Sequence, residues 1–311
     1  MSEFPAGNGP QDDGGKSGEQ PGELLDLAVR VAREAAATAR RMRAEAIGDV
    51  QTKSTATDVV TAADKAVERQ VVEALRTARP GDSVLGEEYG STETEEYGST
   101  ETEEYGSTET EERGSTETGG RTEPGAVRWI LDPIDGTVNY LYGIPQYAVS
   151  LAAEVDGVVV AGVVVNAATG DEWTATRGGG AWRGDRRLRG SGPDGLGQSL
   201  VGTGFSYDAR RREHQGRVVA GLITRVRDIR RLGAAALDLC AVAEGVLDGY
   251  YEKGLNPWDW AAGGLVATEA GIVVSGLNGA APGLDMLVAA PPAIFGPLHD
   301  ALAELDASGG P

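Results

Sequence analysis

Two apolar runs joined by a tight turn constrain the fold of this chain more than any other feature. Residues 147–155 (YAVSLAAEV) and 158–166 (VVVAGVVVN) are rich in residues that favour strands, and Asp156-Gly157 stands between them. An Asp-Gly pair in that position is typical of a two-residue β-hairpin. The sequence therefore predicts an antiparallel hairpin in the middle of the chain.

The remaining periodicity predicts an α/β protein. Apolar residues recur at helical spacing in residues 23–47 and 61–79, and short apolar runs predict strands at 83–88, 127–131 and in 172–184. After a glycine-rich stretch at 190–197, predicted strands alternate with predicted helices, the strands at 199–204, 226–230 and 246–252 and the helices near 211–224, 234–244, 258–271 and 291–305. This alternation indicates layers of helices and sheets. We expect halves at 23–190 and 191–305, with tails at 1–22 and 306–311.

Most of the negative charge is concentrated in a short repeat. The 311-residue chain has a formal net charge of −20, and residues 87–118 are four tandem octapeptides, EEYGSTET three times and then EERGSTET. The repeat has no aliphatic residues to bury, and such segments rarely offset the entropy of ordering. We expect residues 87–118 to be a disordered surface insertion, which a loop tolerates at small entropic cost.

Composition excludes several classes of function. A chain this acidic is poorly suited to binding nucleic acid or an anionic membrane surface. The single cysteine, Cys240, excludes an internal disulfide, and two histidines leave little for a histidine-based metal centre. Any metal would be a hard cation bound by carboxylates. With no apolar run long enough to span a membrane and no signal-peptide pattern, we expect a cytoplasmic protein.

Acidic residues stand at the expected ends of strands and starts of helices in separate segments. In WILDPIDGT (129–137) Asp132 and Asp135 flank a turn, and the amides of Gly136 and Thr137 could bind a phosphate. Paired divalent cations and an amide cradle suit the hydrolysis of a phosphoester. The same segment could be a simple Asx-turn with a helix cap. Glu87 in LGEE and Asp259 in NPWDWAAG, each taken alone, could likewise be either metal ligands or ordinary turn and helix-cap residues.

The order of these motifs resembles a known family. K-S, D-V-V-T-A-A-D, G-E-E, W-I-L-D-P-I-D-G-T-x-N-Y, Y-Y-E, N-P-W-D-W-A-A-G and E-A-G follow one another as in the inositol monophosphatases, which are Mg²⁺-dependent and lithium-sensitive phosphatases. The resemblance covers residues 23–305. It implies a layered αβαβα sandwich of the inositol monophosphatase/fructose-1,6-bisphosphatase type, commonly assembled as a homodimer.

The resemblance also implies a metal site for two, or with a weaker ion three, Mg²⁺ ions. Glu87, Asp132 and the carbonyl of Ile134 match the ligands of the first ion. Asp132, Asp135 and Asp259 match those of the second. Glu87 matches a residue that also helps to bind the third ion, and it therefore counts among the catalytic residues. Copies of the Glu-Glu pair recur along the repeat, but only Glu87 follows a predicted strand.

Further roles follow from the same resemblance. Thr137, hydrogen-bonded to Asp64, matches the pair that activates the attacking water, and Lys53 matches a lysine close to that water. The amides of Gly136 and Thr137 match the phosphate cradle. Glu252 matches the acid that binds inositol hydroxyls. The residues matching the rest of that substrate pocket are Asp135, Gly233 and Ala235. Read without the family pattern, Asp64 could instead be an exposed polar position on a helix.

The implied activity is hydrolysis of a small polyol phosphate, with myo-inositol 1-phosphate as the first candidate. The same chemistry on histidinol phosphate, fructose 1,6-bisphosphate or a 3′-phosphonucleotide stays open. Ala234 stands where the family often has Ser or Thr, and this loss of a hydroxyl group leaves the substrate less defined. A non-catalytic regulatory protein on the same fold is an alternative of another class.

Overall fold

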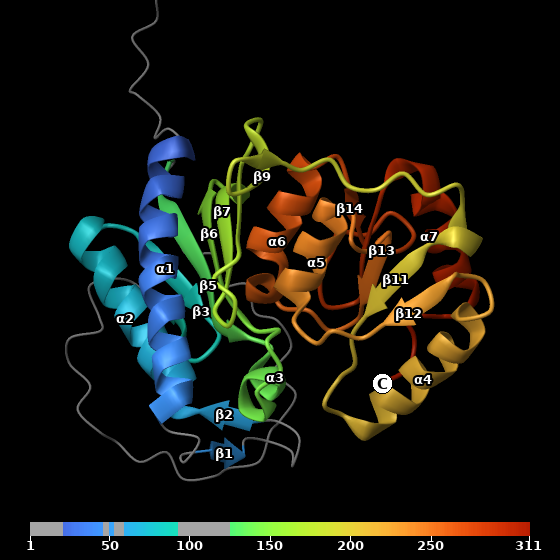
Figure 1. The fold of residues 1–311 in the computed structure, drawn as a ribbon, viewed down its shortest axis with the longest axis horizontal. Helices are drawn as coiled ribbons and strands as arrows, with labels where there is room; N and C mark the ends of the chain where they lie inside the picture. Colours follow the sequence, from blue (N-terminus) through green and yellow to red (C-terminus); the bar gives the residue numbers. More distant parts are fainter. Residues whose placement is uncertain (1–20, 46–49, 53–58, 93–124) are drawn as a thin grey trace, which may run out of the picture.

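The protein is a five-layer sandwich of helices and sheets. The computed structural model describes residues 21–45, 50–52, 59–92 and 125–311. Figure 1 shows helices, a sheet, helices, a second sheet and helices following one another across the long axis. This arrangement confirms the predicted αβαβα sandwich. Within the described ranges no helix is both long enough and apolar enough to cross a membrane.

The larger sheet has eight strands in the order β10-β9-β8-β7-β6-β5-β3-β4. The predicted hairpin is confirmed, because β6 (Ala148–Val155) and β7 (Val158–Asn166) pair antiparallel on either side of the Asp-Gly turn. The parallel pair of this sheet is β3 (Ser83–Gly86) beside β5 (Val127–Asp135). Its other strands are β4 (Gly90–Thr92), β8 (Glu172–Thr176), β9 (Gly180–Arg183) and β10 (Arg186–Arg187).

Two amphipathic helices cover the outer face of this sheet. α1 (Pro21–Glu45) and α2 (Ala62–Ala78) bury their apolar sides against β5, β6 and β7. Trp129 of β5 is fully buried beneath them, and its indole nitrogen donates to Asp82 Oδ2 at 2.8 Å. α1 begins at Pro21, within the predicted tail, because proline is well suited to the first turn of a helix.

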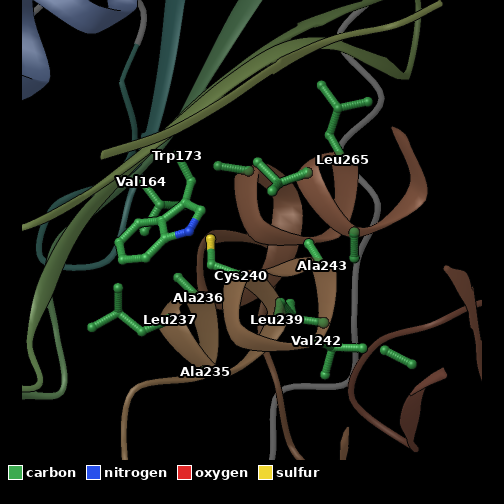
Figure 2. Packing of buried hydrophobic residues seen from close by; sticks show 14 of the residues in the cluster. Val164, Trp173, Ala235, Ala236, Leu237, Leu239, Cys240, Val242, Ala243 and Leu265 are labelled. Atoms are coloured by element: carbon green, nitrogen blue, oxygen red, sulfur yellow. The ribbon is translucent and has the colours of Figure 1, made fainter. Parts of the chain in front are cut away.

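Two helices rich in small residues fill the space between the sheets. α5 (Ala235–Glu244) and α6 (Pro257–Glu269) are apolar on nearly all sides, as expected of helices packed between two sheets. Figure 2 shows Cys240 among the apolar side chains of this cluster, near Trp173 of the larger sheet. The single cysteine is therefore a buried core residue.

The second sheet has five strands in the order β12-β11-β13-β15-β14. The predicted strands β11 (Leu200–Thr203), β12 (Asp228–Arg230) and β13 (Gly249–Glu252) run parallel to one another. Two short strands that the sequence did not reveal, β14 (Val273–Ser275) and β15 (Leu287–Ala290), close the sheet. The predicted helices α4 (Ala209–Leu222) and α7 (Pro292–Glu304) cover its outer face.

The repeat begins inside the fold. β4 consists of residues from the first octapeptide and pairs antiparallel with β3. The expectation that the whole tract from residue 87 is a disordered insertion is therefore wrong for residues 87–92. They form a turn and an edge strand because β3 offers them an unpaired edge. Residues 93–118 and most of the predicted tail 1–22 lie outside the described residues. So do residues 46–49 and 53–58, which come before and after β1 (Val50–Thr52); β2 (Val59–Thr61) leads directly into α2.

The close approach of α5 and α6 gives a stability prediction with a matched control. A Cβ added at Gly263 of α6 would lie 2.9 Å from the Ala236 carbonyl oxygen of α5, whereas Gly216 of α4 has open space around it. We expect Gly263→Ala to destabilise the protein by roughly 1–3 kcal/mol through overpacking. Gly216→Ala should stabilise it by about 0.5–1 kcal/mol, because alanine is the better helix former. Urea unfolding of both variants checks this, and equal effects would contradict the packing argument.

Candidate active site

All of the predicted site residues except Lys53 and Asp64 line one pocket. A cavity of about 310 Å³ opens where β3 and β5 end and where α5 and α6 begin. Five acidic residues line it, and we call them the pocket acids: Glu87, Asp132, Asp135, Glu252 and Asp259. The pocket is also lined by Ile134, Gly136, Thr137, Gly233 and Ala235. The fold therefore brings together residues that are up to 172 positions apart in the sequence.

The end of β5 positions two of the pocket acids. The strand predicted at 127–131 is longer in the structure, because β5 continues past Pro133 to Asp135 across a bulge between Asp132 and Asp135. A bulge lets the strand accommodate a proline that cannot donate to the ladder. Asp132 and Asp135 are 2% and 7% exposed, so both are buried at the base of the pocket.

A glycine turn follows directly. Gly136 has a φ of 87°, in the left-handed region, and precedes the short helix α3 (Thr137–Tyr142). A Cβ at Gly136 would lie 2.8 Å from the Gln146 carbonyl oxygen. Both the backbone conformation and this close approach therefore require glycine.

Thr137 and Asp64 only partly match the predicted pair. The Thr137 hydroxyl donates to the Ile134 carbonyl oxygen at 3.1 Å. The hydrogen bond between Thr137 and Asp64 therefore stays a prediction. Asp64 lies in the first turn of α2 and is 1% exposed, which contradicts its alternative reading as an exposed helix position. Its carboxylate lies near enough to Asp132 to raise the pKa of that residue.

Two pocket acids accept hydrogen bonds from the starts of helices. Asp135 accepts from the amides of Ala235 at 3.2 Å and Ala236 at 2.8 Å, at the start of α5. Asp259 is the third residue of α6 rather than its N-cap, and its Oδ2 accepts from the Asn256 amide at 2.6 Å. These bonds hold the two helices at the pocket. They leave each carboxylate oxygen with further acceptor capacity.

Glu252 lies at the end of β13, across the pocket from β5. The Tyr250 hydroxyl donates to its Oε2 atom. Gly233 and Ala235 lie beside it in the pocket lining, and Gly233 takes a φ of 89°. This group is the predicted substrate-binding set, and the fold gathers it in one place.

Asn139 is a buried residue that supports the site, and its type and sequence position gave no indication of this role. Its side-chain amide donates to the carbonyl oxygens of Gln146 and Leu232 at 2.8 Å and of Gly233 at 3.3 Å. It therefore ties α3 and its glycine turn to the loop before α5. It stands within the quoted motif D-G-T-x-N-Y, but the partners of a buried amide cannot be read from sequence.

Burial and mutual repulsion dominate the electrostatics of the pocket. Burial, followed by the charge of neighbouring carboxylates, raises the pKa of Asp132 well above its ordinary value. Burial likewise raises the pKa of Asp135 to about 7, although the amides of α5 act in the opposite direction. The pKa values of Asp259 and Glu252 are raised mainly by burial as well.

The residues present fit a hard divalent cation. Asp132 Oδ1 is buried and accepts no hydrogen bond within the described structure, so an acceptor atom at the centre of the pocket acids is left for another partner. Negatively charged carboxylates, which offer only oxygen atoms as ligands, suit Mg²⁺. Among the described residues, no three acidic, histidine or cysteine side chains are gathered tightly enough to enclose one ion. The ligand set therefore stays a prediction, as does Lys53, which lies outside the described residues.

A layered α/β sandwich with such a pocket defines a class of phosphatases. The inositol monophosphatase family matches residues 20–305, and the chain belongs to that family. Membership of this family indicates that the protein is a phosphatase that acts on a small phosphorylated substrate. The family is generally metal-dependent.

Individual relatives agree with this assignment. The chain is 45% identical to an inositol-1-monophosphatase of Mycobacterium leprae over 297 residues, covering 91% of this chain and 94% of the relative. The solved structure of Mycobacterium tuberculosis SuhB has a TM-score of 0.72 at 39% identity, covering 93% of this chain and 99% of that one. A Pseudomonas aeruginosa relative named Nus factor SuhB is 36% identical, covering 82% of this chain and 86% of its own length.

The raised pKa values predict how the stability of the metal-free protein depends on pH. An unfolded aspartate titrates near about 3.9, whereas Asp135 in the folded protein titrates at about 7. Between these values the unfolded chain loses its proton first, so the stability falls as pH rises. We expect the unfolding temperature in EDTA to fall from about pH 5 to about pH 7. Thermal melts check this, and a rise over that range would contradict the electrostatics described here.

Proposed function

We propose that this protein is a Mg²⁺-dependent phosphomonoesterase that hydrolyses myo-inositol 1-phosphate to inositol and phosphate. The observation that supports this most directly is the convergence of the pocket acids beside the Gly136 turn. The relative from Mycobacterium leprae is named an inositol-1-monophosphatase, which supports this choice of substrate.

The residues of the pocket divide into two groups in this proposal. Glu87, Asp132, Asp135, Asp259 and the Ile134 carbonyl would hold two Mg²⁺ ions, with capacity for a third weaker one. Bound Mg²⁺ lowers the pKa of a water nucleophile and neutralises the charge on the phosphoryl oxygens and the leaving oxygen.

The protein's own groups then orient the ester. The amides of Gly136 and Thr137 face the phosphate, because the turn leaves them unused by helix α3. The Thr137 hydroxyl and Asp64 direct the attacking water, which reaches phosphorus in line with the departing alkoxide. Because water itself is the nucleophile, no phosphoenzyme forms.

Substrate recognition rests on the opposite wall. Glu252, oriented by Tyr250, accepts hydrogen bonds from polyol hydroxyls. The backbone around Gly233 and Ala235, which lines the same pocket, limits the size of the polyol ring. The same geometry suits histidinol phosphate, fructose 1,6-bisphosphate or a 3′-phosphonucleotide. A panel of these esters assayed with and without Mg²⁺ separates them.

A second candidate is a non-catalytic regulatory role. It is favoured by the name of the Pseudomonas aeruginosa relative, Nus factor SuhB. An intact acidic pocket argues for catalysis instead, because a protein without a reaction gains nothing from carboxylates that burial makes costly. Mg²⁺-dependent phosphate release from the purified protein decides between the two.

Asp132→Asn gives the sharpest test of the site. Removing the charge should lower kcat for myo-inositol 1-phosphate by about a hundredfold or more. It should also raise the unfolding temperature of the metal-free protein, because one source of repulsion disappears. Phosphate release and thermal melts of the same preparation measure both effects. Asp185→Asn, on an exposed turn, is the matched control and should change neither. Near-normal turnover in Asp132→Asn would refute the assignment.

A further inference from the structure

The turn that carries Glu87 connects β3 to the edge strand β4. Gly86, the last residue of β3, lies opposite Leu131 in the parallel pairing with β5. Glu87 and Asp132 are the next residues along these two strands, so they follow neighbouring positions of the same ladder. Burial, followed by the charge of Glu87, raises the pKa of Asp132, which shows that the two carboxylates are close. The position of the turn therefore determines how these two acids face each other.

A carboxylate from α2 binds the main chain of this turn. Glu68 Oε2 accepts a hydrogen bond from the Glu88 amide at 2.9 Å, and Glu68 Oε1 accepts one from the Tyr89 amide at 3.2 Å. Two consecutive amides thus use both oxygens of one carboxylate, which fixes the orientation of the turn as well as its position. Because Glu88 and Tyr89 directly follow Glu87, these two bonds also orient the backbone from which the Glu87 side chain projects.

The strand pairing leaves this part of the turn to Glu68. The ladder between β3 and β4 joins Gly86 to Gly90, and residues 87–89 lie between them as the turn. The amides of residues 88 and 89 receive their acceptors from α2 instead. The hydrogen bonds of Glu68 therefore add a restraint at the point where the ladder supplies none.

The surroundings of Glu68 are built to hold a carboxylate. Glu68 is 1% exposed and does not line the pocket. A Cβ at Gly86 would overlap Glu68 Oε1, so the glycine at the end of β3 leaves the space that this carboxylate occupies. Burying a carboxylate costs free energy, and bonds to neutral amides offset only part of that cost. A carboxylate kept in this position, in contact with the turn and not with the pocket, indicates a positioning role.

We propose that Glu68 is a positioning residue of the metal site: through the amides of Glu88 and Tyr89, it holds the Glu87 carboxylate beside Asp132, where both can bind one Mg²⁺ ion. The inference rests on the proposed function, in which Glu87 and Asp132 are ligands of that ion. It deepens the proposal by adding a residue outside the pocket on which metal affinity depends. Loss of a group that orients a metal ligand typically lowers metal affinity by about 10- to 100-fold.

A double-mutant cycle on metal affinity tests this role without turnover. Mn²⁺, which prefers the same oxygen ligands as Mg²⁺, is titrated into the metal-free protein, and electron paramagnetic resonance measures the free ion. Glu68→Gln leaves one acceptor oxygen for two amides, and we expect it to weaken Mn²⁺ binding by about tenfold. Glu87→Gln should weaken binding further. The double variant should bind within about twofold of Glu87→Gln alone, because Glu68 acts through Glu87.

Two further variants separate positioning from a loss of structure. Glu73→Gln is the matched control, since Glu73 is an exposed acid on the same helix and does not line the pocket. It should leave the Mn²⁺ affinity unchanged. Gly86→Ala displaces the Glu68 carboxylate without removing a charge, and it should weaken Mn²⁺ binding by a factor similar to that of Glu68→Gln. Thermal melts in EDTA identify any variant that does not fold, and Gly86→Ala decides the question if Glu68→Gln is such a variant.

Unchanged Mn²⁺ affinity in folded Glu68→Gln overturns the inference, and so does unchanged affinity in Gly86→Ala. A double variant weakened by the full product of the two single effects overturns it as well, because Glu68 would then act independently of Glu87. Failure of the proposed function is distinguishable. If Glu87→Gln itself keeps the full affinity, the proposed ligand set is wrong and the inference falls with it. If the cycle behaves as expected but myo-inositol 1-phosphate is not hydrolysed, the positioning role stands and only the proposed activity fails.

Discussion

The close packing of α5 and α6 between the two sheets is the constraint on which the rest of the structure depends. Gly162 of β7 faces Ala262, and Gly263 faces Ala236, so larger side chains would push the layers apart. Because Asp135 accepts hydrogen bonds from the start of α5, and Asp259 lies in the first turn of α6, the same packing sets the positions of both carboxylates. The core thus determines the geometry of the pocket.

The acidic residues that suit the pocket to its function also lower the stability of the folded protein. Buried carboxylates that repel one another weaken the folded state, and hydrogen bonds from helix amides offset only part of this effect. A divalent cation would remove the repulsion and at the same time provide the charge that phosphoester hydrolysis needs. The unpartnered Oδ1 of Asp132 shows the same principle, since it is an atom suited to a partner of opposite charge.

Much of this protein follows from local signals in the sequence. The Asp156-Gly157 pair is a strong turn signal, and the helices α1 and α2 carry clear helical periodicity. The strand β5 is recognisable as a short apolar run. Short strands such as β14 and β15 carry little periodicity, so they emerge only when neighbouring strands supply hydrogen bonds. The first octapeptide shows the same effect, because the free edge of β3 turns part of a low-complexity tract into strand β4.

The sequence by itself determined the class of fold and supplied the acidic residues that are candidates for the site, because motif order and residue type are local properties of the chain. Only the tertiary structure decided which atoms face each other: Thr137 toward Ile134, Asn139 toward the Gly233 loop, and residues 309–311 against Arg211 and Lys253. Such contacts join segments far apart in sequence or depend on one rotamer. Their geometry is fixed by packing, for which a linear pattern contains no signal.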